Sequence, residues 1–138
     1  MKTFEELKEE LLIRAKNAGA CQLGYAMGLR SNTRADLLKA ITDNWFWVLR
    51  DAKIVDARYL EDNFTEEELS NAGIYTKKYH EVRTASFACG SATVKAYGNS
   101  YIEDYIGNIR PESDYAIVKD YHNHKIYIKK GQFEIIEV

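Results

Sequence analysis

The first half of the chain carries apolar residues at the three- and four-residue spacing of amphipathic helices. Thr3 followed by Glu6 has the spacing of a capping box, in which the hydroxyl accepts from the backbone while the carboxylate reaches back. Gly19 and Gly73 stand where a helix can end in a left-handed cap. The pattern predicts helical segments at residues 3–18, 21–29, 33–49, 56–64 and 65–72.

Beyond Gly73 the pattern changes to β-forming residues between glycine-containing turns. Eight of the ten tyrosines lie in this part, together with Thr, Val and Ile. No linker or low-complexity stretch separates the two halves. We therefore predict an α+β fold, in which a helical subdomain (1–73, helical from about residue 3) packs as a cap on a β subdomain (74–138) to form one unit.

An internal repeat gives the β half its predicted shape. Residues 92–99, Ala-Thr-Val-Lys-Ala-Tyr-Gly-Asn, return 24 positions later at 116–123 as Ala-Ile-Val-Lys-Asp-Tyr-His-Asn, with five of eight positions identical. A finer step of eight places hydrophobic residues in phase at Val94, Ile102, Val118 and Ile126. A short fixed period is typical of a stacked, solenoid-like β coil, and such folds commonly present a binding surface.

Two arrangements of this half compete. A meander with two-residue turns would place Val94 opposite Glu103 and would mix small apolar residues with tyrosines on one face. A coil that keeps the eight-residue phase sorts them cleanly, with Ala92, Val94, Ala96, Ser100 and Ile102 facing inward. The sorting favours the coil. A 24-residue turn with three sides would then stack Val94 under Val118 and Tyr97 under Tyr121.

The ends of a two-turn coil need covers, because stacked turns leave their last core residues exposed. The helical half is expected to cover one end. Residues 125–138, which alternate around Lys130-Gly131, are expected to form a closing hairpin at the other end. Asp104 and Asp120 fall on the inward phase, so we expect them at corners of the coil.

One histidine pair could hold a metal. On a strand, Asp120, His122 and His124 would project from one face, which makes a small metal-dependent hydrolase an alternative function. The same residues occupy predicted corner positions, where polar side chains are natural. We favour the corner interpretation, and we predict no catalytic residue, no metal site and no cofactor.

Charge and cysteine content narrow the classes of partner. The 138 residues carry 19 basic and 21 acidic side chains, a net charge of −2, so no basic excess favours binding to nucleic acid. No apolar segment is long enough to span a bilayer, and the N-terminus is too acidic for a signal peptide. Cys21 and Cys89 lack a nearby second cysteine, which indicates reduced thiols and a cytoplasmic protein.

The outward positions of the coil supply a candidate binding surface. Aromatic side chains flanked by cations are common at the centres of protein interfaces. The competing interpretation is that outward tyrosines only stack from one turn to the next and stiffen the sheet. The predicted binding residues are Lys95, Tyr97, Tyr101, Tyr105, Lys119 and Tyr121.

Residues 6–21 and the Ala-Thr-Val-Lys-Ala-Tyr-Gly-Asn octad together resemble a group of largely uncharacterised proteins from phages and mobile elements of gut anaerobes. Members of that group begin with short helices and continue with copies of A-x-V-x-A-[Y/W]-G-N. This chain departs from the pattern, since it has one clean octad, a degraded second at 100–107 and a partial third at 116–123. The resemblance implies a phage or mobile-element setting and brings no activity with it.

These observations together predict a non-enzymatic protein that binds another macromolecule, with a protein as its expected partner. In the setting that the resemblance implies, the concrete hypothesis is an inhibitor of a host defence system, such as a CRISPR nuclease. Besides the hydrolase, a virion or structural accessory protein is the remaining alternative.

Overall fold

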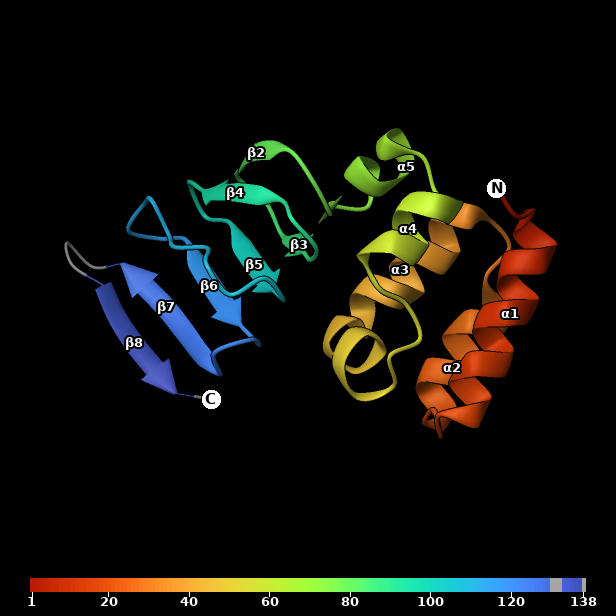
Figure 1. Cartoon of the computed structure of the whole chain (residues 1–138). Coiled ribbons are helices and arrows are strands. Elements are labelled where there is room, and N and C mark those ends of the chain that lie inside the picture. The colour runs from red at the N-terminus through yellow and green to blue at the C-terminus, as the bar shows by residue number, and fades with distance from the viewer. Residues whose placement is uncertain (130–132, 138) are drawn as a thin grey trace. The chain divides into compact units, whose positions relative to one another are not determined.

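The computed structural model describes residues 1–129 and, for the backbone, residues 133–137. Helices precede strands along the chain, so the predicted α+β class is confirmed (Figure 1). The chain divides into two compact units, Met1–Ala72 and Gly73–Val138, which we call the helical unit and the β unit. That the two pack together as one unit stays a prediction.

Five α-helices and one π-helical turn build the helical unit. They are α1 (Phe4–Asn17), α2 (Gln22–Arg30), α3 (Arg34–Asp43), η1 (Trp47–Asp51), α4 (Ala57–Asn63) and α5 (Glu66–Asn71). Every α-helix begins at a side chain that accepts a hydrogen bond from the backbone N–H three residues later, which satisfies one of the orphan donors of the first turn. These five N-cap residues are Thr3, Cys21, Thr33, Asp56 and Thr65.

The third predicted helix is interrupted. The sequence predicts one helix through Leu49, whereas α3 ends at Asp43 and the chain continues into the wider turn η1, where Ala52 N–H donates to the carbonyl of Trp47 at 2.8 Å. The Asn44 side chain follows α3 and donates to the carbonyl of Ala40 at 2.8 Å. The predicted apolar stripe is still buried on both sides of this break, at Leu37, Leu38, Ile41, Trp45, Val48 and Leu49.

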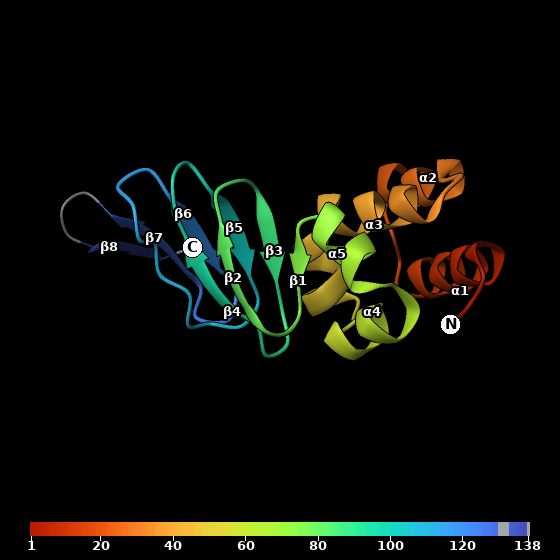
Figure 2. The same ribbon diagram turned by 90° about the horizontal axis from the view of Figure 1, so that it is seen from above.

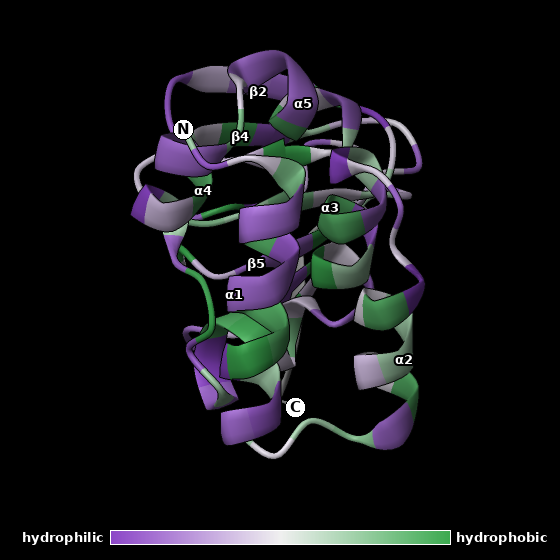
Figure 3. Ribbon diagram, turned by 90° about the vertical axis from the view of Figure 1, so that its right-hand side faces the viewer, coloured by the Kyte–Doolittle hydropathy of each residue, from purple (hydrophilic) through white to green (hydrophobic). Residues whose placement is uncertain are grey.

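A half-buried arginine ties the helical unit together. Arg34 donates to Glu68 on α5 at 2.8 Å, to the carbonyl of Lys2 at 3.0 Å and to the carbonyl of Asn63. Its guanidinium also lies 4.9 Å from the centre of the Phe64 ring. Because this one side chain bonds to three separate segments, it fixes the start of α3 against the two short helices. Figure 3 shows that both α1 and α3 contain hydrophilic and hydrophobic residues, with α3 the more hydrophobic of the two.

The β unit consists of two sheets. The larger has the order β1-β3-β5-β6-β7-β8, and the smaller pairs β2 with β4. Pairing is parallel from β1 to β6 and between β2 and β4, and it becomes antiparallel from β6 to β8. Figure 2 shows the strands in this order along the unit. The strands are β1 (Ile74–Tyr75), β2 (Tyr79–Val82), β3 (Ser86–Ala88), β4 (Thr93–Ala96), β5 (Tyr101–Asp104), β6 (Ile117–Asp120), β7 (Lys125–Lys129) and β8 (Phe133–Glu137).

The parallel pairing confirms the coil but corrects its turn. Ser86 pairs with Ile102 and Tyr101 with Ile117, so one turn of the coil is 16 residues long from β3 through β6, with two sides instead of three. The turns that begin at β1 and β2 are shorter, since Ile74 pairs with Phe87 and Tyr79 with Thr93. Val94 lies opposite His80 in β2, so the predicted stacking of Val94 under Val118 is wrong, and so is the meander. The 24-residue echo is therefore one and a half turns. Such a spacing places equivalent octads on opposite sheets.

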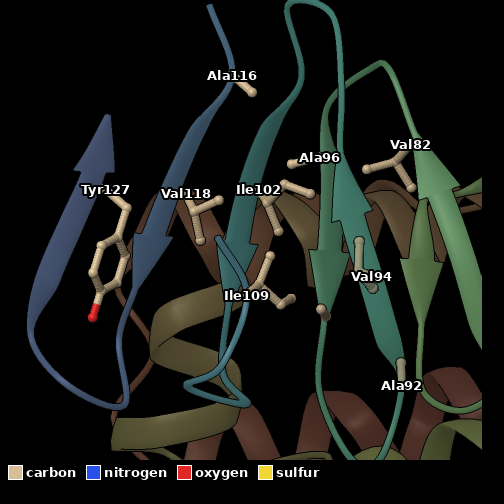
Figure 4. Packing of buried hydrophobic residues seen from close by; sticks show 10 residues of the cluster. Val82, Ala92, Val94, Ala96, Ile102, Ile109, Ala116, Val118 and Tyr127 are labelled. Carbon is tan, nitrogen blue, oxygen red and sulfur yellow. The ribbon is translucent and has the colours of Figure 1, made fainter. Parts of the chain in front are cut away.

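The inward phase predicted for the coil is confirmed by burial. Ala92, Val94 and Ala96 from one side and Ile102 and Val118 from the other are all at most 5% exposed and belong to one cluster. Figure 4 shows these side chains on neighbouring strands, with Val82, Ile109 and Tyr127 completing the core. Small residues dominate because two sheets of a narrow coil approach each other closely. The side chains of both sheets share this core, so their outer faces lie on opposite sides of the unit.

The two inward aspartates form the corners that the sequence predicts. Asp104 ends β5, and its carboxylate accepts from the backbone N–H of Ile106 at 2.6 Å and of Gly107 at 3.2 Å. Asp120 ends β6 one turn later and accepts from the backbone and side chain of Asn123 at 2.9 and 2.8 Å. Both are fully buried and are register partners. Each carboxylate thus accepts hydrogen bonds from residues two or three positions later, and this local turn ends the strand.

The closing hairpin is also confirmed. β7 and β8 pair in antiparallel register, Lys125 with Glu137 and Lys129 with Phe133. The predicted turn at Lys130-Gly131 lies outside the described residues. Where the coil ends, the Arg110 guanidinium lies 3.8 Å from the centre of the Tyr127 ring and covers that inward aromatic side chain. An arginine plane on an aromatic face shields the last core residue while it keeps its charge near water.

Candidate binding surface

The outer face of the six-stranded sheet is the first of two candidate surfaces. By strand alternation, the residues next to the core positions of β5, β6 and β7 point away from the core. We call this surface the broad face and define it by Tyr101, Glu103, Tyr105, Ile117, Lys119, Tyr121, Ile126 and Ile128. Six of these eight residues are register partners across neighbouring strands, so the surface is continuous.

The tyrosines of the broad face differ in their contacts. Tyr121 is only 8% exposed, because its hydroxyl donates to Glu103 at 2.8 Å and the Lys119 ammonium lies 5.0 Å from the centre of its ring. Burial, followed by the hydrogen bond to the Glu103 carboxylate, raises the pKa of Tyr121 well above its ordinary value. Tyr101 is 39% exposed, and burial raises its pKa as well, with the Glu103 charge second. Tyr121 therefore stabilises the surface from within, whereas the exposed side chain of Tyr101 can contact a binding partner.

The outer face of the smaller sheet has a different character. Here Lys95 forms an ion pair with Glu112 at 3.3 Å, and the Arg83 guanidinium lies 5.2 Å from the centre of the Tyr97 ring. Tyr79 is 55% exposed, and its hydroxyl donates to Glu81 at 3.0 Å. We call this surface the narrow face. Its charged and aromatic side chains are engaged with one another.

The structure thus divides the six predicted binding residues between opposite faces. Tyr101, Tyr105, Lys119 and Tyr121 lie on the broad face, and Lys95 and Tyr97 lie on the narrow face. The prediction that Tyr97 stacks under Tyr121 is wrong, because residues 24 apart are half a turn out of step in a coil of 16-residue turns. The sequence does contain a signal for the 16-residue turn. Asp104-Tyr105 returns as Asp120-Tyr121 after 16 residues, and a repeated corner residue marks the same corner.

Sequence reasoning missed the aliphatic part of the broad face. Ile117 on β6 lies opposite Ile128 on β7, and Lys119 lies opposite Ile126. All three isoleucines are partly exposed. The outward phase of Ile117 follows from the same alternation that placed Lys119 outward, so this residue could have been found. The contribution of β7 depends on the antiparallel pairing, which the repeat does not encode.

The histidine constellation adopts the corner geometry. Residues 121–124 form a turn, His122 lies against Gly107, and His124 has a φ of 57°. The Asp120 carboxylate is engaged by Asn123, as described above. Within residues 1–129 and the backbone of 133–137, no group of three His, Cys, Asp or Glu side chains is arranged to hold a metal ion. The hydrolase alternative therefore finds no supporting geometry in these residues.

Comparisons of the chain with protein-family models, with curated proteins and with solved structures find no match. Among the described residues, no helix combines the length and the apolar character that crossing a membrane requires. Cys21 and Cys89 are both present as thiols, exposed in the helical unit and buried in the β unit respectively.

Proposed function

We propose that this chain is a non-enzymatic protein whose broad face binds another protein. The observation that carries the proposal is the apolar and aromatic composition of that face. The water-facing side of a sheet ordinarily carries polar residues, because only its other side packs on a core. Here Tyr101, Ile117, Ile126 and Ile128 occupy water-facing positions on three adjoining strands.

The charge of the broad face favours a protein over a nucleic acid. Among its eight residues, one carboxylate (Glu103) balances one ammonium (Lys119), so the face offers no excess of positive charge to phosphates. Exposed tyrosines and aliphatic side chains with few charges are the composition that protein interfaces concentrate at their centres. The narrow face, where charges already pair within the chain, is the less favourable of the two.

The finer proposal concerns the setting. The resemblance to phage and mobile-element proteins supports a cytoplasmic inhibitor of a host defence system, with a nuclease of the CRISPR type as the concrete partner. The thiol state of both cysteines agrees with a reducing compartment. The partner's identity rests on the resemblance, whereas the binding face rests on geometry, and the two parts are tested separately.

A matched pair of variants tests the binding face. Ile126→Glu places a charge at the centre of the broad face, opposite Lys119, where the new carboxylate has a cation to pair with. Tyr79→Ala removes a more exposed tyrosine from the narrow face. Parent and variants are immobilised, exposed to a host lysate, and the retained proteins are quantified by mass spectrometry.

We expect one protein to be retained by the parent and by Tyr79→Ala but lost with Ile126→Glu, while circular dichroism shows all three chains folded. Loss with Tyr79→Ala alone would place the site on the narrow face and contradict the proposal. Equal retention by all three chains would show that the broad face does not bind the retained protein and that its side chains only stiffen the sheet. Direct binding of the purified nuclease to the parent, measured by calorimetry, decides the finer proposal.

A further inference from the structure

A cavity of about 300 Å³ lies in the helical unit, between α1, α2, α3 and η1. Its lining is mainly apolar and includes Leu11, Leu12, Tyr25, Ile41, Trp47 and Ile54. Ligand sites begin at about this volume, and an apolar cavity of about 150 Å³ already binds benzene. The space is therefore sufficient for a bicyclic ring system. It lies entirely within Met1–Ala72, so it is separate from the broad face.

Helix α2 leaves this space open. No residue of α2 is buried, and Leu23 and Leu29 are 81% and 51% exposed. Two glycines of α2 line the cavity, although glycine lowers the stability of a helix by about 1 kcal/mol relative to alanine. A Cβ on Gly28 would lie 2.9 Å from the terminal Cδ2 of Leu12, so the end of that side chain would have to move. A Cβ on Gly24 would meet only ordinary contacts, so this glycine widens the cavity without being required by packing.

The polar groups of the lining indicate what the cavity can hold. Lys8 is the charged residue of the lining, and its ammonium already donates to the carbonyls of Leu29 and Ser31, at 2.8 Å each. The Asn44 amide donates to the carbonyl of Ala40, which leaves its oxygen Oδ1 directed toward the Gly24 side of the cavity, 3.7 Å from where a Cβ would stand. An acceptor in an apolar wall selects a neutral molecule that carries a donor.

We propose that this cavity binds a small, uncharged aromatic molecule of about two fused rings, with a hydroxyl or N–H group that donates to Asn44 Oδ1. The rings pack against Trp47, Tyr25 and the leucines of α1, and the donor satisfies the amide oxygen. A cationic molecule is excluded, because the lining contains Lys8 and no carboxylate to balance a second positive charge.

The probe for this site is 2-naphthol, added to the full-length, ¹⁵N-labelled chain and followed by amide chemical shifts. We expect saturable shifts at Gly24, Gly28, Ala40 and Asn44. Naphthalene, which lacks the donor, should bind about fivefold more weakly, and the cation 2-naphthylmethylammonium should not bind. In Asn44→Ala, 2-naphthol and naphthalene should bind equally, because the acceptor is gone.

Filling the cavity provides the control. Ala40→Leu projects a larger side chain into the space, so it should weaken 2-naphthol binding at least about tenfold and raise the melting temperature of the unliganded chain. If Ala40→Leu does not fold, Gly24→Ala serves the same purpose, since its methyl group fits the helix and narrows the cavity. The proposal is overturned if shifts are absent, if they map to the β unit, or if the filled variant binds 2-naphthol like the parent.

Discussion

The helical unit and the β unit are stabilised in opposite ways. In the helical unit, each helix is defined locally by its own cap, and Arg34 then joins distant segments through directed hydrogen bonds. In the β unit, no single turn of the coil has a core, and stability comes from stacking small apolar residues of successive turns. The helices of the first unit can therefore be predicted from local sequence signals. The fold of the β unit depends instead on which strands pair, and the paired residues are far apart in the sequence.

The largest effect is expected inside the coil. Ile102→Ala removes a fully buried side chain between the sheets and should lower the stability of the β unit by about 3 kcal/mol, because the narrow core cannot collapse around the cavity. The neighbouring Tyr101→Ala, which truncates a side chain on the opposite face, should have a much smaller effect. Amide hydrogen exchange in β3, β5 and β6 measures both. Equal effects would contradict the inward and outward sorting.

A smaller loss is expected for the arginine of the helical unit. Arg34→Ala leaves the Asn63 carbonyl and the Glu68 carboxylate without their shared donor, so stability should fall by about 2 kcal/mol. Arg58→Ala is the matched control, because the Arg58–Asp62 pair is largely exposed and should contribute less than about 0.5 kcal/mol. Hydrogen exchange in α3 and α5 reports the difference. An Arg34 variant as stable as the Arg58 variant would remove its role as the joining residue.

The smallest effect depends on pH. Burial raises the pKa of Asp104 above its ordinary value, and the Asp120 carboxylate adds to the rise, against the lowering by hydrogen bonds from Ile106 and Gly107. The folded chain therefore binds this proton more tightly than the unfolded chain. Stability that depends on Asp104 is present below its ordinary pKa of 3.8 and is lost as pH rises through the raised pKa.

Asp104→Asn cannot titrate, so its free energy of unfolding relative to the parent should increase from about pH 4 to pH 7. Denaturant titrations of both chains across this range measure the difference. Subtracting the parent removes the opposite trend of Glu10 and Glu68, whose pKa values are lowered by the side chains of Lys2 and Arg34. A difference that is constant or decreasing with pH would show that Asp104 is not strained by burial.

The sequence predicts more of this molecule at short range than at long range. Thr3, Thr33 and Thr65 mark helix starts because a cap contacts a residue only three positions away. The octad predicts correctly which side chains of β4, β5 and β6 face inward, since strand alternation is also local. Its phase is wrong in β7, where Ile126 faces outward and Tyr127 faces the core. The octad does not specify how many octads complete one turn of the coil. A turn of two octads and a turn of three octads both keep the same residues facing inward. Corner residues and sheet packing make that choice, so the sequence pattern alone places Lys95 and Tyr97 on the same surface as Tyr121.

The central claim is that two octads complete one turn of the coil, and disulfide trapping tests it directly. Glu103 and Lys119 are register partners in parallel strands, so cysteines at both positions lie within the reach of a disulfide. Lys95 and Lys119, which a 24-residue turn would stack, lie on opposite faces. In a Cys21→Ser background, mild oxidation should link Glu103→Cys to Lys119→Cys and should leave the Lys95→Cys, Lys119→Cys pair reduced, as mass spectrometry will show. A link between positions 95 and 119, with none between 103 and 119, would contradict the two-sided coil.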